Sequence, residues 1–168
     1  KMLEYIRIQE VDQQLYLFYL QQKEYFFHIE KNESLSFQDV VDDMLPPPGF
    51  ENHEHYYYKV FENQRMIGYV DCMKGYRYSC IHDDHCLWIG LFLVNESDQR
   101  KHYGQQIFLD LLEMISDISL IQLGCLKNNP KGLAFWKHLG FYEIDHTCPP
   151  KREIIVLERK KSNDKGTV

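Results

Sequence analysis

Seven consecutive residues near the middle of the chain carry side chains that could do chemistry. The stretch CIHDDHC, residues 80–86, holds two cysteines, two histidines and two aspartates. Four nitrogen and sulfur ligands can enclose zinc, but structural zinc sites usually join two separated ligand pairs. Because this set is confined to one short stretch, we expect no metal there. A metal site that hydrolyses a substrate and a solvated polar loop remain as alternatives.

A second polar stretch, NESDQRKHYG at residues 95–104, follows a long apolar run that ends at Val94. Helical spacing resumes at about Tyr103, so several backbone N–H groups and the positive end of a helix dipole are predicted to converge at this junction. Such a place binds phosphate groups. The alternative is a solvated, charged turn that precedes a core helix.

Periodicity along the chain predicts the elements that must position these residues. The order is strand, two helices, three strands, helix, strand, helix and two strands, which gives a mixed sheet with helices on its faces. The predicted strands lie at residues 5–11, within 53–76 as two strands joined at 62–64, and at 86–94, 118–126, 141–146 and 152–159. The predicted helices lie at residues 13–30, 37–45, about 103–117 and 130–140.

Length and composition indicate one globular domain. The chain has 168 residues, of which 44% are hydrophobic and 26% charged, so it can bury a sizeable core. We take Met2 as the native start and expect a single domain over residues 2–160. The polar residues 161–168 are predicted to be a frayed tail.

Charge and cysteine content narrow the partners and the compartment. A net charge of −6 argues against a nucleic-acid surface and agrees with a cationic acceptor. No apolar run approaches the roughly 20 residues of a membrane span, and the first residues lack a signal peptide's apolar core. The five cysteines form no CxxC pair and are predicted to be reduced thiols. We therefore expect a cytoplasmic protein without a membrane or nucleic-acid partner.

Two motifs resemble a known family. The segment LFLVNESDQRKHYGQQIFLDLL, residues 91–112, is similar to the acyl-CoA binding segment of the GNAT superfamily of N-acetyltransferases, whose signature is Q/R-x-x-G-x-G/A after the fourth strand. Residues 99–104 fill those six places. The segment NNPKGLAFWKHLGF, residues 128–141, is similar to the family's asparagine-containing helix that ends in an aromatic residue followed by Gly-Phe. The matching element order extends the resemblance over residues 5–159.

The resemblance implies an α/β (α+β) fold of GNAT type, with a central mixed, mostly antiparallel sheet of six to seven strands and about four flanking helices. It also implies acetyl-CoA as co-substrate. Backbone groups at the end of the fourth strand would pair with the pantetheine arm, and N–H groups of the following turn would hold the pyrophosphate. The implied cofactor-binding residues are Phe92, Leu93, Val94, Gln99, Arg100, Lys101, His102, Tyr103, Gly104, Gln105, Asn129 and Trp136.

Two positions depart from the family pattern. His102 stands where the signature has its first glycine, which normally lets the backbone approach phosphate and adopt an unusual φ. Trp136 stands where the family often has tyrosine, and an indole cannot protonate a departing thiolate. Solvent or Tyr142 would take over that role, and Trp136 is expected to be core or a wall against the pantetheine.

The general base is less clearly marked. Trp88 occupies the place where some members carry a glutamate, so Asp84 and His85 are the predicted catalytic residues. In that interpretation the residue 80–86 loop lies near the acceptor, Asp83 and Asp84 attract a cationic amine, and His85 accepts its proton. Glu54 or His55, at the start of an earlier strand, and a surface histidine without a catalytic role are the alternatives.

The resemblance therefore implies an N-acetyltransferase that moves an acetyl group from acetyl-CoA to a primary amine, of a small molecule, by direct attack in a ternary complex. A non-catalytic acyl-CoA binding or sensing domain is the alternative, motivated by the two departures. Members of the family often dimerise, so a homodimer remains open.

Overall fold

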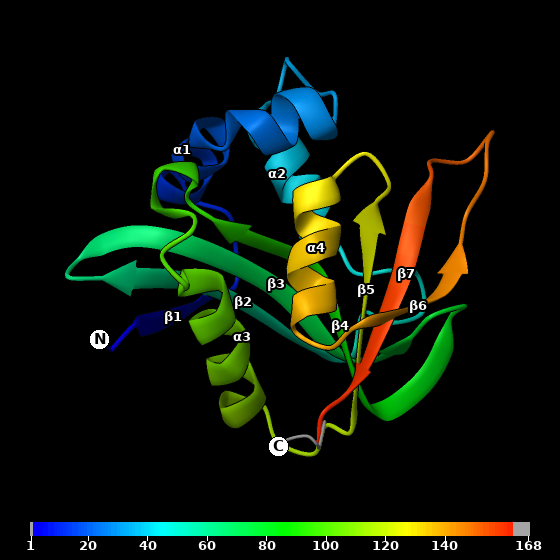
Figure 1. Cartoon of the computed structure of the whole chain (residues 1–168). Helices are drawn as coiled ribbons and strands as arrows, with labels where there is room; N and C mark the ends of the chain where they lie inside the picture. The colour runs from blue at the N-terminus through cyan, green and yellow to red at the C-terminus, as the bar shows by residue number, and fades with distance from the viewer. Residues whose placement is uncertain (1, 163–168) are drawn as a thin grey trace. The chain divides into compact units, whose positions relative to one another are not determined.

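Seven strands are hydrogen-bonded in the order β1-β2-β3-β4-β5-β7-β6 (Figure 1). The computed structural model describes residues 2–162. Its compact units are Lys1–Asp71 with Leu91–Phe108, and Cys72–Gly90 with Leu109–Val168. The long strands β3 (Arg65–Arg77) and β4 (Ile81–Val94) contribute to both units. The predicted mixed α+β fold with up to seven strands is confirmed, whereas a single domain over residues 2–160 stays a prediction.

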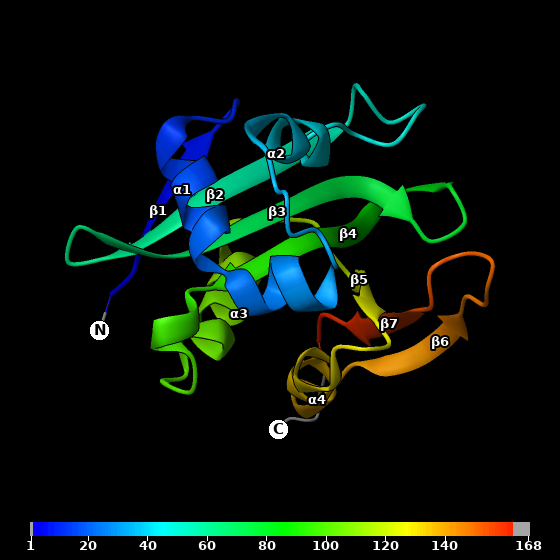
Figure 2. The same cartoon turned by 90° about the horizontal axis from the view of Figure 1, so that it is seen from above.

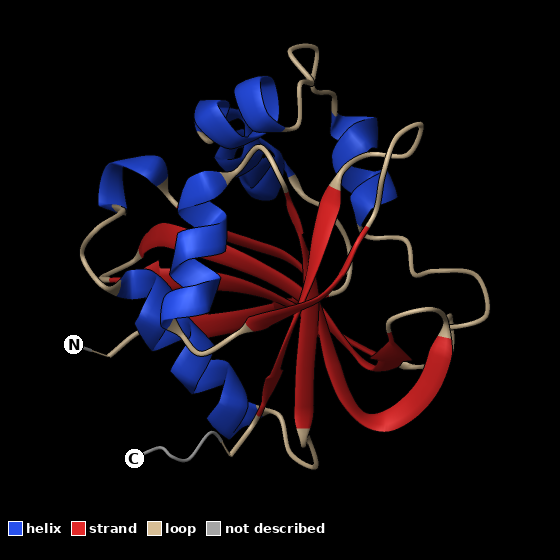
Figure 3. Cartoon of the chain, turned by 45° about the vertical axis from the view of Figure 1, so that its right-hand side comes forward, coloured by secondary structure: helices blue, strands red, loops and turns tan. Residues whose placement is uncertain are grey.

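The other elements follow the predicted order closely. The remaining strands are β1 (Glu4–Ile8), β2 (Glu54–Glu62), β5 (Leu120–Leu126), β6 (Tyr142–His146) and β7 (Ile154–Lys160). The helices are α1 (Gln13–Gln21), a π-helix (Glu24–Ile29), α2 (Phe37–Asp43), a 3₁₀ turn (Glu96–Asp98), α3 (Tyr103–Met114) and α4 (Pro130–His138). Figure 3 distinguishes helices in blue from strands in red.

In the first unit, helices and strands share an aromatic core. β1 pairs antiparallel with β2, and β2 turns into β3 at Asn63 and Gln64, which both have positive φ as a two-residue hairpin turn requires. Figure 2 shows α1 and α2 close to β2. Apolar residues of both helices, the π-helix and three strands meet in one buried cluster: Leu15, Phe18, Tyr19, Phe26, Leu35, Val40, Tyr57, Tyr69 and Leu93.

The long helix predicted over residues 13–30 is wrong in one respect, because it breaks at Gln22. The Gln22 side chain donates to the Phe18 carbonyl and to Asn95 Oδ1, both at 2.9 Å, and accepts from the Glu96 N–H at 2.8 Å. Gln22 is 1% exposed. A buried amide with three partners fixes the chain at this point, and the π-helix begins two residues later.

In the second unit, β4 pairs in parallel with β5, from Cys86–Leu120 to Ile89–Leu123. β7 pairs antiparallel with both β5 and β6. α4 begins at Pro130 after the cap residue Asn129, whose Oδ1 accepts the Gly132 N–H at 3.0 Å. The predicted frayed tail falls largely on residues 163–168, which lie outside the described residues.

The stretch CIHDDHC is not the predicted loop. β4 begins at Ile81, so the turn is limited to residues 78–80, where Ser79 and Cys80 have positive φ. An Arg77–Asp83 ion pair at 3.1 Å links the strands on both sides of the turn. β3 extends to Arg77, and its backbone groups need hydrogen-bond partners. The polar segment supplies these partners, while the side chains of the segment stay mostly exposed.

Within residues 2–162, no helix is both long and apolar enough to cross a membrane.

Candidate functional site

The turn between β4 and α3 has an unusual backbone. Arg100 has φ 66° and His102 has φ 65°, both in the left-handed region that few residues other than glycine adopt. His102 occupies the place of the signature's first glycine and adopts a backbone conformation that glycine tolerates. The substitution therefore leaves a left-handed turn in place.

This turn leads directly into the first turn of α3. The Gln106 N–H donates to the His102 carbonyl at 3.2 Å, so His102 is the last residue before the helix. The N–H groups of Tyr103, Gly104 and Gln105 have no carbonyl four residues earlier within the helix to accept them. Three N–H donors and the positive helix end thus lie together, which is the arrangement that binds phosphate.

Asp98 fixes the turn through several hydrogen bonds. Its carboxylate accepts hydrogen bonds from Arg65 Nη1 at 2.6 Å, from Arg65 Nη2 at 2.9 Å and from Asn95 Nδ2 at 3.0 Å. Lys101 Nζ lies 3.4 Å away. Hydrogen bonds from Arg65 are the largest cause that lowers the pKa of Asp98, to about 2. Of the two predicted cationic side chains in the turn, Lys101 is therefore held by Asp98.

The same turn is tied to the junction between α1 and the π-helix. Glu96 accepts the N–H of Glu24 at 2.8 Å and of Tyr25 at 3.3 Å, in addition to the bonds at Gln22. The Tyr103 hydroxyl donates a short hydrogen bond to Glu62, which is buried. These contacts fix the backbone of the turn from both of its ends.

The end of β4 presents alternate backbone groups to its two edges. The Asn95 N–H donates to the Ile67 carbonyl of β3 at 2.8 Å, and the Leu93 carbonyl lies beside Gly68 of β3. Since backbone groups alternate along a strand, Phe92 and Val94 direct theirs toward the edge away from β3. The Val94 carbonyl accepts Gln99 Nε2 at 3.2 Å.

Two aspartates of the first unit are not among the site residues predicted from the sequence. Asp71 lies on β3 in the otherwise apolar run YVDCM, and Asp43 ends α2. Burial raises the pKa of Asp71 to about 7. Asp43 keeps an exposed surface, and partial desolvation together with repulsion from neighbouring carboxylates raises its pKa to about 6. A single carboxylate inside an apolar strand was the available sequence signal, because a charged residue is rarely placed on a buried face without a reason.

The predicted catalytic residues Asp84 and His85 lie in the second unit, in the exposed first part of β4. The His85 ring Nδ1 is 3.0 Å from the Asp117 carbonyl, and the His85 carbonyl accepts the Ser119 N–H at 2.8 Å. The neighbouring Asp83 is held by Arg77 and by the His85 N–H. His85 thus connects the first part of β4 to the segment just before β5.

Asn129 and Trp136 have structural partners in the second unit. Asn129 caps α4, as described above. Trp136 is 6% exposed, and its ring packs edge-on against Phe135 at 4.8 Å and Phe141 at 5.2 Å between centroids. The Tyr142 hydroxyl donates to Glu158 at 2.9 Å, which raises the pKa of Tyr142. Trp136 is therefore a core residue of its unit.

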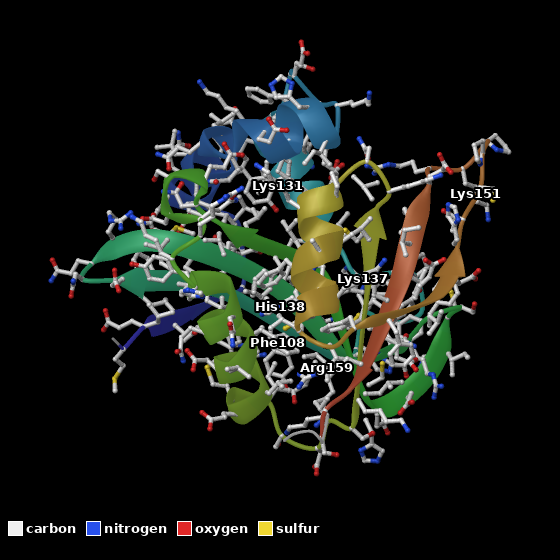
Figure 4. The ribbon with its side chains drawn as sticks, viewed as in Figure 1. Phe108, Lys131, Lys137, His138, Lys151 and Arg159 are labelled. Atoms are coloured by element: carbon white, nitrogen blue, oxygen red, sulfur yellow. The ribbon has the colours of Figure 1, made fainter. Side chains whose placement is uncertain are left out.

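Exposed basic side chains mark both ends of α4. Figure 4 shows Lys131 near its start and Lys137 and His138 near its end. The two at the end lie where the negative pole of the helix dipole favours cations. Across the described residues, no group of three or more His, Cys, Asp or Glu side chains is placed to hold a metal.

Comparison with known families gives a match over most of the chain. The family model described as Acetyltransferase (GNAT) family matches residues 11–141. The search of curated proteins gave no match.

Solved structures share the fold at low identity. An acetyltransferase from Thermus thermophilus is 19% identical with a TM-score of 0.75, covering 95% of this chain and 97% of the other. Spermidine N-acetyltransferase from Vibrio cholerae, in complex with CoA and spermine, is 14% identical with a TM-score of 0.68 over 95% and 96%. Aminoglycoside acetyltransferase AAC(6')-Ib, in complex with coenzyme A and kanamycin, is 16% identical with a TM-score of 0.68 over 95% of each chain.

Proposed function

Because the chain belongs to the GNAT acetyltransferase family, we propose that it transfers the acetyl group of acetyl-CoA to a primary amine of a small molecule. The amine would attack the thioester directly while both reactants are bound. Two of the structural neighbours are a spermidine and an aminoglycoside acetyltransferase, which supports a small-molecule amine as the acceptor class.

One observation carries the cofactor part of the proposal, namely the left-handed conformation of Arg100 and His102 ahead of α3. This backbone leads into the N–H groups of residues 103–105 at a helix N-terminus, and backbone donors suit a pyrophosphate. The Arg100 side chain is exposed and has no ion pair among the described residues, so it is available to add charge.

The strand end supports the pantetheine part. Phe92 and Val94 direct backbone groups away from β3, as an added extended ligand would require. The Val94 carbonyl already accepts Gln99 Nε2, but a carbonyl oxygen has a second lone pair for a cofactor N–H. The backbone groups of Leu93 are directed toward β3 and its side chain lies in the buried cluster, so its contact with the cofactor stays a prediction.

A reducing compartment agrees with this function. All five cysteines are free thiols, and Cys72, Cys86 and Cys125 are buried. Free buried thiols are typical of proteins that fold in the cytoplasm. We therefore propose a cytoplasmic location.

Calorimetric titration with acetyl-CoA tests the proposal. Gly104→Glu should abolish binding, because it adds a carboxylate at the first turn of α3, where the pyrophosphate would lie. Leu109→Glu is the matched control, since Leu109 is 44% exposed and lies about 140° round the same helix. Binding by the wild type and the control but not by Gly104→Glu supports the proposal. No binding by the wild type would refute it.

A non-catalytic acyl-CoA binding domain is the second candidate, because a buried tryptophan replaces the family's usual tyrosine. The two candidates differ in turnover. An enzyme releases free thiol from acetyl-CoA with at least one amine from a panel, and a binding domain releases none.

A further inference from the structure

We infer that Asp71 is the base that takes the proton of the acceptor amine, and that Asp43 and Tyr19 complete an acidic site for its ammonium group. The inference rests on the proposed function and gives it a base other than Asp84 or His85. It also narrows the acceptor to amines that are cationic in solution.

Strand geometry places Asp71 on the face of β3 that packs against α1 and α2, not on the face toward α3. Gly68 of β3 faces α3, because a Cβ at that position would lie 3.1 Å from Ile107 Cδ1. Side chains alternate along a strand, so Tyr69 and Asp71 both point to the opposite face. Tyr69 is 1% exposed within the aromatic cluster beneath α1 and α2.

Asp43 and Tyr19 lie at the same cluster. Tyr19 contacts Tyr69 with ring centroids 6.1 Å apart, and its hydroxyl donates to Asp43 Oδ2 at 3.3 Å. Burial is the largest cause of the raised pKa values of Asp71 and Tyr19, and repulsion from Asp43 adds to both, with Asp71 adding to that of Tyr19. Three elements, α1, α2 and β3, therefore bring two carboxylates and one hydroxyl together.

Asp71 differs from the other enclosed carboxylates of this unit in its hydrogen bonding. Asp98 is held by Arg65, and Glu62 by the Tyr103 hydroxyl. No donor within residues 2–162 reaches the Asp71 carboxylate, although the residue is only partly exposed. An enclosed carboxylate without a donor is unfavourable unless a ligand supplies one. An ammonium group is the donor that would satisfy it.

The surroundings of Asp71 match the task of a general base. Burial is the main cause of its raised pKa, about 7, and Asp43 adds to it. The titratable groups that face this site are Asp43 from α2, Tyr19 from α1 and Tyr69 from β3 itself. A base works best when its pKa lies near the working pH, so that it is ionised yet able to take a proton.

The proposed acidic site and the end of β4, where the cofactor would bind, adjoin the same buried cluster. Leu93 of β4 belongs to the buried cluster that contains Tyr19 and Tyr69, and Leu91 packs against that cluster. An acetyl thioester bound along Phe92 to Val94 would therefore end beside the cluster whose β3 face carries Asp71. All of these residues belong to the first unit.

The reaction balances with these groups alone. Asp71 carboxylate takes one proton from the bound ammonium, which leaves a neutral amine. The amine nitrogen attacks the acetyl carbonyl, a C–N bond forms, and the C–S bond breaks as the tetrahedral intermediate collapses. The second proton leaves the nitrogen and goes to the thiolate of coenzyme A, and Asp71 returns its proton to solvent.

The charges around Asp43 favour acceptors with more than one cationic group. After burial, repulsion from Glu30, Asp39 and Asp42 raises the pKa of Asp43, so their negative charges act on it. One ammonium at Asp71 and a second near α2 would neutralise this surplus. A diamine or polyamine meets this requirement better than a monoamine.

Steady-state acetylation of spermidine, kanamycin and butylamine, followed by thiol release, tests the inference. Asp71→Asn should lower kcat/KM about 100-fold or more at pH 7 with the best of these amines. The loss should shrink toward pH 10, where the amine is increasingly neutral without a base. Asp43→Asn should mainly raise KM for spermidine. Glu10→Gln, which neutralises an exposed carboxylate of the same unit outside this site, is the control and should keep kcat within about threefold.

Acetyl-CoA binding by calorimetry separates the possible failures. Asp71→Asn should bind acetyl-CoA as the wild type does, which excludes misfolding as the cause of lost activity. If the wild type binds no acetyl-CoA or acetylates no amine, the proposed function fails and this inference fails with it. If the wild type is active and Asp71→Asn stays within threefold across the pH range, only this inference is overturned. Larger loss in Asp84→Asn or His85→Gln than in Asp71→Asn would move the base to β4.

Discussion

Arg65 donates two hydrogen bonds to the Asp98 carboxylate, from Nη1 to Oδ2 at 2.6 Å and from Nη2 to Oδ1 at 2.9 Å. Asp98 is 2% exposed, whereas the Arg65 side chain is 53% exposed. The pair joins the start of β3 to the turn that carries Arg100 and His102. The phosphate-binding geometry proposed for this turn therefore depends on an ion pair between residues distant in sequence.

Acid should weaken the protein through Asp98. Its pKa is lowered from 3.8 to about 2 in the folded state, so its stabilisation is complete above about pH 4 and is lost as the pH falls toward 2. Between pH 7 and pH 3 the wild type should lose about 1 kcal/mol more free energy of unfolding than Asp98→Asn. Urea unfolding at both pH values measures this difference, with Asp42→Asn as a control that should behave as the wild type. Equal losses in all three proteins would contradict the prediction.

Substitutions at His102 should separate its backbone from its imidazole. His102→Gly keeps the left-handed φ without a Cβ, so acetyl-CoA affinity should stay within about threefold and stability within about 1 kcal/mol. His102→Val places a β-branched residue at the same φ, which should destabilise by about 1–2 kcal/mol and weaken binding at least tenfold. Calorimetric titration and thermal unfolding measure both effects. Equal weakening by glycine and valine would show that the imidazole itself binds the cofactor.

Gly68→Ala should disturb the cofactor strand. The added Cβ would lie 3.0 Å from the Leu93 carbonyl and 3.1 Å from Ile107 Cδ1. We expect a loss of about 1–3 kcal/mol in the free energy of unfolding and weaker acetyl-CoA binding. Ile107→Val in the same background removes only the side-chain clash, and recovery there would show that the β4 backbone is not the critical neighbour.

Thiol reagents should distinguish two classes of cysteine. Cys80 and Cys148 are exposed, whereas Cys72, Cys86 and Cys125 are buried. Burial raises the pKa of Cys86 to about 12 and of Cys125 to about 11, which keeps both as unreactive thiols. In native protein, two thiols should react quickly with a chromogenic disulfide, and five should react in denaturant. Rapid reaction of more than two thiols would contradict this prediction. The reaction of the protein's own thiols must also be subtracted when release of coenzyme A is assayed with the same reagent.

Much of the fold follows from local pattern. The apolar stripe of α3, the Asn129-Pro130 start of α4 and the Asn63-Gln64 turn lie where the sequence predicts them, because periodicity and capping act over a few residues. The boundary errors lie where distant residues decide. β4 begins at Ile81 because β3 supplies its pairing partner.

The sequence by itself determined the family, through two spaced motifs, and the location of the proposed phosphate-binding turn. Tertiary structure alone decided that His102 adopts a positive φ, that Gln22 interrupts the first helix, and that Asp43 and Asp71 lie at one cluster. The physical reason is that motifs record local backbone needs, whereas the pKa of a carboxylate depends on burial and on charges brought together from separate elements. The proposed acetyl-CoA turn could therefore be predicted from the sequence, and the proposed base could not.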